Sequence, residues 1–165
     1  MFADLADLLR RFASLGATRA FCKPLAENDN SKQQIYLGGS LEVLQMFPVK
    51  DVVATPNGMD STYKAKLDFV WISDDETERA VGAQLILYPR YPEVRLSGFL
   101  RGCKTAPNEQ LRPVPADQRQ FNNGPDGRIL FFGVTSAGET LAYLASADSP
   151  LAREFRQRQA DGEYS

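Results

Sequence analysis

The chain has 165 residues, of which 43% are apolar and 24% charged, an ordinary balance for one globular domain. Its formal net charge is −2, so it is not a polybasic nucleic-acid binder as a whole, and any binding to an anion requires a local patch. The absence of histidine excludes Ser-His-Asp and Cys-His catalysis and the commonest zinc ligand. Carboxylate and Mg²⁺ chemistry, which many nucleases use, stays open.

The N-terminus and the two cysteines indicate a cytoplasmic protein without a membrane segment. Residues 1–12 mix charges with apolar positions, unlike a signal peptide. No apolar run approaches the roughly 20 residues that span a bilayer. Without a secretory signal, Cys22 and Cys103 are expected to be reduced thiols, with a disulfide between them as the alternative.

The first third of the chain predicts two helices with two strands between them. Over residues 2–15, apolar residues recur at i, i+3, i+4 and i+7, and Gly16 ends this helix. Ser40 caps a short second helix over 41–47, which Pro48 terminates. Between the helices we predict two strands and a polar, turn-forming loop: 18–25, then the loop 26–32, then 33–37.

Five more strands and a C-terminal helix are predicted after residue 60. Alternation in TYKAKLDFVWI indicates a strand of about ten residues, which an acidic turn follows. Two hairpin-like pairs come next, separated by a long loop that contains prolines, asparagines and glycines. The strands are 62–72, 82–88, 93–100, 128–135 and 139–146, the turn is 73–79 and the loop is 104–126. Pro150 opens the last helix, 151–159, at its favoured first position.

The strands come in runs and do not alternate with helices. This pattern predicts a mainly β (α+β) fold, with about seven antiparallel strands in a barrel-like arrangement and helices at the ends. Residues 1–165 are expected to form one domain.

Charge is distributed unevenly along the chain. The segment 51–80 carries seven acidic residues: Asp51, Asp60, Asp68, Asp74, Asp75, Glu76 and Glu78. The segment 88–119 carries six basic residues against three acidic ones, a net charge of +3. Together with Lys23 and Lys32 it could form a positive surface, which phosphate binding requires. A solvated surface without a ligand is the alternative.

The first polar constellation is Lys23 with the run from residue 28 to residue 34. Its candidate residues are Lys23, Asn28, Asn30, Ser31, Lys32, Gln33 and Gln34. Asn and Gln can pair with adenine through two hydrogen bonds, and Ser or Lys can hold phosphates. A capped turn is the alternative, because Asn and Asp also bond their own backbone. Two glutamines entering an apolar strand are less easily explained by a turn.

The second constellation lies between residues 90 and 97. Its candidate residues are Arg90, Tyr91, Glu93, Arg95 and Ser97. Arg is the usual reader of guanine, and Glu can accept from the cytosine amine. Glu93 and Arg95 alternate on the predicted strand, so they share a face and could read a G and a C in one groove. A surface ion pair is the alternative.

A nuclease site is not found. Restriction-type nucleases carry an acid-x-Lys triplet on a strand, and the chain contains none. The nearest fragment, Asp60 to Asp68 with Lys64 and Lys66, fits a half-exposed strand with alternating lysines better. Neither a P-loop nor a Cys₄ metal spacing is present, and we expect neither metal nor cofactor.

The order of these motifs resembles the N-terminal effector domain of EcoRII-type restriction endonucleases. The matching features are the Lys23-x-Leu25-x-x-Asn28-Asp29 opening, the strand with two glutamines, a helix that ends on Phe47-Pro48, and Glu93-x-Arg95 followed by an apolar residue. The hairpin 128–145 fits the family's last strands. The resemblance covers about residues 20–145 with gaps, and the chain departs from it at Pro89, Tyr91, Pro92 and Val94, where more basic or polar residues are usual.

The resemblance implies a B3-like, seven-stranded open pseudobarrel that grips the major groove of double-stranded DNA with two arms. Carried over by position, the N-arm is 28–34 and the C-arm is 90–97. Such Type IIE effector domains read sites of the CC(A/T)GG kind and act on a separate catalytic domain of the same protein. The chain is therefore expected to be a non-enzymatic, sequence-specific DNA-binding part of a restriction-modification system. The alternatives are a metal-dependent nuclease and a β-barrel that binds a protein or a small ligand.

Overall fold

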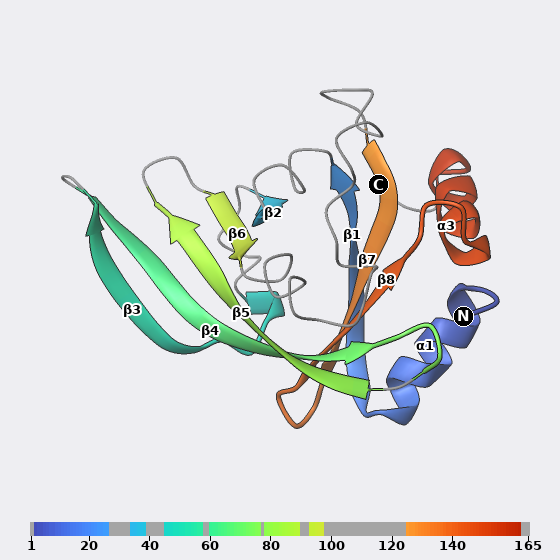
Figure 1. Ribbon diagram of the computed structural model, residues 1–165, viewed down its shortest axis with the longest axis horizontal. Helices are drawn as coiled ribbons and strands as arrows, with labels where there is room; N and C mark the ends of the chain where they lie inside the picture. Colours follow the sequence, from blue (N-terminus) through green and yellow to red (C-terminus); the bar gives the residue numbers. More distant parts are fainter. Residues whose placement is uncertain are drawn as a thin grey trace.

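One strongly curved sheet carries two terminal helices in the computed structural model (Figure 1). The structure describes residues 2–26, 34–38, 45–57, 60–76, 78–89, 93–97 and 125–162. Its elements are α1 (Leu5–Ser14), β1 (Ala17–Ala26), β2 (Gln34–Gly38), β3 (Lys50–Asn57), β4 (Asp60–Ile72), β5 (Glu78–Tyr88), β6 (Glu93–Ser97), β7 (Pro125–Thr135), β8 (Thr140–Ala145) and α3 (Pro150–Ala160).

The strand order is β1-β7-β8-β4-β5-β6-β2, with β3 paired to β4 outside this path. All pairs are antiparallel except β4 with β8. The sheet curves round so that β1 and β2, the two ends of the path, have no ladder between them among the described residues. The predicted fold class, a mainly β open barrel flanked by short helices, is confirmed.

Strand β4 is long enough to hold three partners. Its 13 residues extend for about 43 Å at about 3.3 Å per residue. Along one edge β5 follows it from Tyr63 to Ile72. Along the other edge β3 pairs with residues 60–66, and β8 pairs with residues 69–71. The part of β4 beside β3 therefore projects beyond the barrel, on the left of Figure 1.

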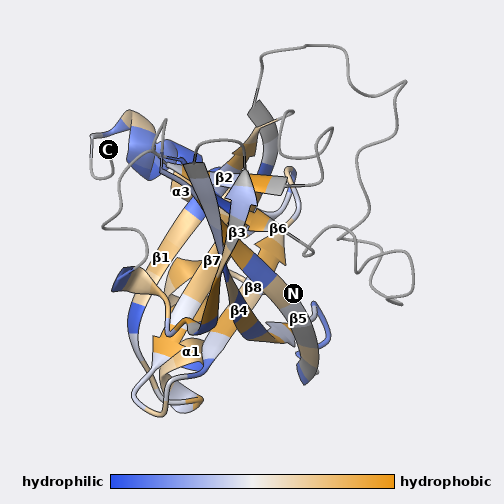
Figure 2. Ribbon diagram, turned by 90° about the vertical axis from the view of Figure 1, so that its left-hand side faces the viewer, coloured by the Kyte–Doolittle hydropathy of each residue, from blue (hydrophilic) through white to orange (hydrophobic). Residues whose placement is uncertain are grey.

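Alternation along β7 produces two apolar layers. Leu130 and Phe132 point into the barrel and join its inner core, whereas Ile129 and Phe131 belong to a second core beneath the helices. All six residues of β8 are buried, because it contributes to both layers. Figure 2 shows that most residues of α3 are hydrophilic. Its apolar residues, Leu151, Ala152 and Phe155, belong to this second core.

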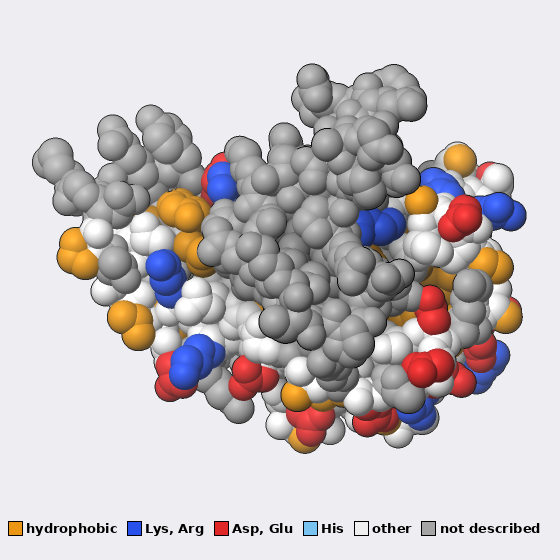
Figure 3. Space-filling model, viewed as in Figure 1, with side chains coloured by type: hydrophobic (Ala, Val, Ile, Leu, Met, Phe, Trp, Pro, Cys, Tyr) orange, Lys and Arg blue, Asp and Glu red, His pale blue; other side chains and the backbone are white. Residues whose placement is uncertain are grey.

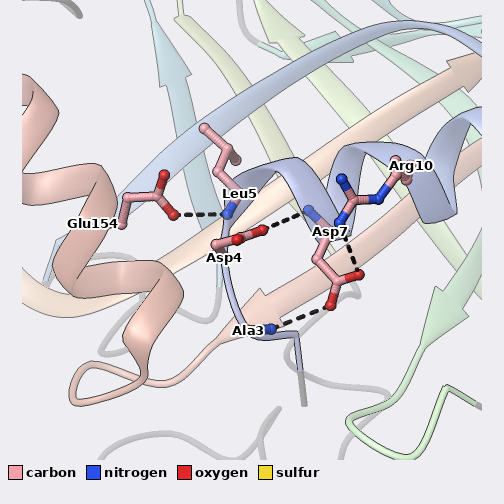
Figure 4. A network of polar contacts seen from close by, with 6 residues as sticks. All are labelled: Ala3, Asp4, Leu5, Asp7, Arg10 and Glu154. Atoms are coloured by element: carbon pink, nitrogen blue, oxygen red, sulfur yellow. Dashed lines mark hydrogen bonds and ion pairs between the residues drawn. The ribbon is translucent and has the colours of Figure 1, made fainter.

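The start of α1 is fixed by hydrogen bonds to its free N–H groups (Figure 4). Asp4 is the N-cap and accepts from the Asp7 N–H at 2.8 Å, while the Asp7 carboxylate accepts from the Ala3 N–H at 3.3 Å. Glu154 on α3 accepts from the Leu5 N–H at 2.7 Å and so joins the two helices. A negative charge at this position also suits the positive end of the α1 dipole.

Most predicted elements are confirmed, and three details differ. The first helix begins at Leu5 instead of residue 2, and Phe2 instead packs edge-on against Tyr143 at 4.8 Å. Strand β5 begins at Glu78, inside the predicted acidic turn, because the turn needs only residues 73–77. Strand β3 was not predicted. The short helix over 41–47 and the loop over 104–126 lie largely outside the described residues.

A hydrogen bond between side chains ties the β4–β5 turn to the centre of the sheet. The Tyr143 hydroxyl donates to Asp74 Oδ1 at 2.5 Å. Burial, together with this bond to an anion, raises the pKa of Tyr143 above its ordinary value. The bond therefore favours the neutral hydroxyl and holds the turn in place.

We predict that Tyr143→Phe lowers the free energy of unfolding by about 1–2 kcal/mol, because a hydrogen bond to a charged group is lost without a large change in volume. Urea unfolding measures this. Tyr63→Phe, at an exposed tyrosine, is the matched control and should change stability by less than about 0.5 kcal/mol. Equal effects of the two substitutions would contradict the role of the Tyr143–Asp74 bond.

Cys22 is a free, half-buried thiol, and Cys103 lies outside the described residues. Burial raises the pKa of the Cys22 thiol to about 11. In a Cys103→Ser variant, the rate of alkylation should therefore rise up to about pH 11 when the protein is folded. In urea it should level off near the ordinary pKa of about 8.5, because the thiolate is the nucleophile. A folded-state rate that levels off near that same pH would contradict the prediction.

Candidate nucleic-acid interface

Strand β6 brings the two predicted arms into one sheet. It lies between β5 and β2, so the strand that follows the N-arm pairs directly with the strand that carries the end of the C-arm. In this register Gln34 lies opposite Ser97, and Tyr36 lies opposite Arg95. Two segments about sixty residues apart in the sequence are thus neighbours in space.

Alternation determines which residues of these strands face outward. Ile35, Val94 and Leu96 are fully buried in the inner core, so Tyr36, Glu93 and Arg95 lie on the outer face of the barrel. Tyr36 is 42% exposed there. For Gln34 and Ser97 the structure describes the backbone positions and not the side chains.

Glu93 and Arg95 share this face, as predicted, and form an ion pair. Arg95 Nε and one terminal nitrogen donate to Glu93 Oε2 at 3.0 and 2.7 Å. The guanidinium also lies over the Tyr88 ring, 5.3 Å from its centroid. With the Arg95 side chain 23% exposed and that of Glu93 35% exposed, the pair is held in a set orientation yet remains in contact with solvent.

Lys23 reaches Tyr36 across the open side of the barrel. Its ammonium nitrogen lies 5.9 Å from the centroid of the Tyr36 ring, a cation–π distance. Lys23 is on β1 and Tyr36 is on β2, the two ends of the strand path. The structure therefore places Lys23, Tyr36, Arg95 and Tyr88 in one run of alternating cations and aromatic rings.

Tyr36 and Tyr88 were missed as candidate residues by the sequence analysis. Tyr36 would follow from alternation, since it is two residues after Gln34, whereas Tyr88 follows from the register that pairs it with Glu93. Their rings hold Lys23 and Arg95 in place. The other candidates lie outside the described residues: Asn28, Asn30, Ser31, Lys32, Gln33, Arg90 and Tyr91.

The predicted positive surface is not visible as a single patch. On the face in Figure 3, Lys and Arg side chains of the described residues are interspersed with Asp and Glu. Most of the basic segment 88–119 lies outside the described residues, so that prediction remains untested.

The described residues contain no group of three or more Cys, Asp or Glu side chains placed to hold a metal ion. Within the same ranges, no helix combines the length and the apolar character that a bilayer crossing needs. An apolar cavity of about 210 Å³ lies between β3, β4 and β5, lined by Val49, Val52, Tyr63, Lys64, Ala65, Leu85 and Leu87.

Comparison with known proteins yields one similar structure. No protein-family model matches the chain, and no curated protein matches it significantly. Among solved structures it is similar to the B3 domain of the UbaLAI restriction endonuclease, whose crystal structure contains cognate DNA. The identity is 20%, over 97% of this chain and 89% of that chain, with a TM-score of 0.47. At these values the likeness carries no conclusion about what this chain binds.

We predict that Glu93→Gln changes the free energy of unfolding by less than about 1 kcal/mol, because both partners of the ion pair are in contact with solvent. Urea unfolding at low and high salt measures this. A loss of more than about 2 kcal/mol would show that the pair is a structural element of the barrel and is not available to a ligand.

Proposed function

We propose that this domain binds a short site in double-stranded DNA through the N-arm and the C-arm. The finer proposal is that it binds in the major groove with sequence specificity, as the effector domain of a Type IIE restriction endonuclease that reads a CC(A/T)GG-like site. In this proposal the catalytic nuclease domain is a separate part of the same full-length protein.

The observation that carries the proposal is the pairing of β2 with β6. This pairing brings together the roots of both arms, that is, the residues at which each arm joins the sheet. The C-arm enters β6 at Glu93, and the N-arm enters β2 at Gln34, opposite Ser97 at the other end of β6. Four residue steps at about 3.3 Å separate these roots by about 13 Å along the strands. The major groove is about 12 Å wide, so arms rooted this far apart suit its two sides.

The chemistry between the arm roots also suits a nucleic acid. Arg95 presents a guanidinium whose direction Glu93 and Tyr88 fix, and an oriented guanidinium is what bidentate contact with guanine O6 and N7 requires. Glu93 would accept from a cytosine amine, and Arg90 would contact a guanine or a phosphate. On the N-arm, Asn30, Gln33 and Gln34 would reach base edges, with Lys23 and Lys32 on phosphates.

The two alternative functions have weaker support. Asp60, Lys64, Lys66 and Asp68 all belong to β4, and the described residues contain no group of three or more acidic or cysteine side chains placed to hold a metal ion. The apolar cavity between β3, β4 and β5 holds about 210 Å³, below the roughly 300–1,000 Å³ of typical small-molecule pockets. DNA binding therefore remains the function that the described residues support best.

The proposal is tested by binding a CC(A/T)GG duplex and a scrambled duplex of equal length at two salt concentrations. Phosphate contacts weaken with salt for both duplexes, whereas base contacts preserve a preference for the specific one. A preference that persists at the higher salt supports the proposal. Equal binding of both duplexes would reject specific recognition of this site, and no binding at low salt would reject DNA binding itself.

We predict that Arg95→Ala abolishes the preference for the specific duplex in a gel-shift assay, because a base contact is worth about 1–3 kcal/mol. Lys32→Ala should instead weaken binding to both duplexes to a similar extent, because a phosphate contact carries no sequence information. Unchanged affinity of the Arg95 variant for the specific duplex would remove Arg95 and its neighbours from the interface.

A further inference from the structure

The register of the sheet extends the candidate interface across two more strands, β5 and β4. From Tyr36 and Arg95 the same cross-strand row continues through Ile86 on β5 to Lys64 on β4. The next row runs from Gln34 and Ser97 through Gln84 to Lys66. Residues directly opposite each other point to the same face, so Lys64 and Lys66 share the outer face with Arg95.

Both lysines are held outward by the core on the other side of β4. Ala65 and Leu67, their neighbours in the chain, are buried in the barrel, while Lys64 and Lys66 are exposed. Within the described ranges, neither ammonium group forms an ion pair. Two lysines whose Cα atoms are about 6.7 Å apart along one strand are thus presented to solvent.

This part of the outer face is not covered by either helix. Helices α1 and α3 pack over β1, β7 and β8, at the opposite side of the barrel (Figure 1). The described acidic residues near these rows include Glu93, which is paired with Arg95, Asp68, which is one row beyond Lys66, and Asp51, which lies on β3 between the residues that pair with Lys66 and Lys64. The row of Lys64 and the row of Lys66 carry no described acidic side chain.

We propose that Lys64 and Lys66 form a second contact with DNA, on the phosphate backbone beside the site that the arms read. This proposal rests on DNA binding by the arms. In it, the duplex that the arms bind also lies over β5 and β4. Strands are about 4.8 Å apart, so β4 lies about 10 Å from β6. In this proposal the lysines contact phosphates at the side of the region between the arms, about one inter-strand step beyond β5. Their contribution is independent of sequence.

The test is the salt dependence of binding by a Lys64→Gln/Lys66→Gln double variant. Removing two phosphate contacts should reduce the slope of log K against log [salt] by about 2. Between about 50 and 200 mM salt, the loss of affinity should therefore become roughly tenfold smaller than in the unmodified protein. The ratio between specific and scrambled duplexes should stay within about twofold, because no base contact is removed.

An Arg10→Gln/Arg153→Gln variant is the matched control. It removes the same charge from exposed positions on α1 and α3, at the other side of the barrel from Lys64 and Lys66, and should leave the slope unchanged.

Each outcome has one meaning. If the unmodified protein binds DNA and the lysine variant has the same slope of log K against log [salt], the proposed second contact is rejected, while binding by the arms is not affected. An equal loss of slope in the arginine control would also overturn the second contact, since the effect would then be one of net charge. Absence of DNA binding by the unmodified protein at low salt would reject the proposed function itself. Circular dichroism checks that each variant folds.

Discussion

The structure depends on a single long strand whose two edges are both in use. Strand β4 pairs with β5 along one edge, while β3 and β8 share its other edge. A backbone ladder satisfies its N–H and C=O groups only where a partner is present, so a strand of 13 residues requires all three. This sharing connects the helix-covered half of the barrel, which includes β7 and β8, to the half that carries the arms.

The two halves differ in how they bury apolar surface. Around β8, both faces of the sheet are covered, by the inner core on one side and by α1 and α3 on the other. Around β6, Val94 and Leu96 are buried in the inner core, while Glu93 and Arg95 on the outer face reach solvent. A sheet with one dry face and one wet face is rigid and also free to present polar groups, as a binding surface requires. The cation–aromatic contacts of Lys23 and Arg95 then fix the polar groups of this surface.

Several elements could be predicted because their signals are local. The apolar stripe of α1, the place of Pro150 at the first position of α3, and the alternation in β4 each operate within a few residues. Strand β3 was missed because Val52, Val53 and Ala54 do not alternate with polar residues and Pro56 follows closely. Its ladder with β4 makes it a strand, although all three of those residues are exposed. In the sequence, Asn57-Gly58 was the available hairpin signal.

The sequence by itself determined the mainly β class, most of the strands, and the shared face of Glu93 and Arg95, because periodicity acts over a few residues. Only the tertiary structure decided that β2 lies against β6, and that Tyr36 and Lys23 approach across the open side of the barrel. It also decided that Lys64 and Lys66 continue the rows of the arm residues, where the sequence had indicated no more than an exposed strand. Such neighbours depend on strand order and register, which are set by packing among segments far apart in the chain and not by any local pattern.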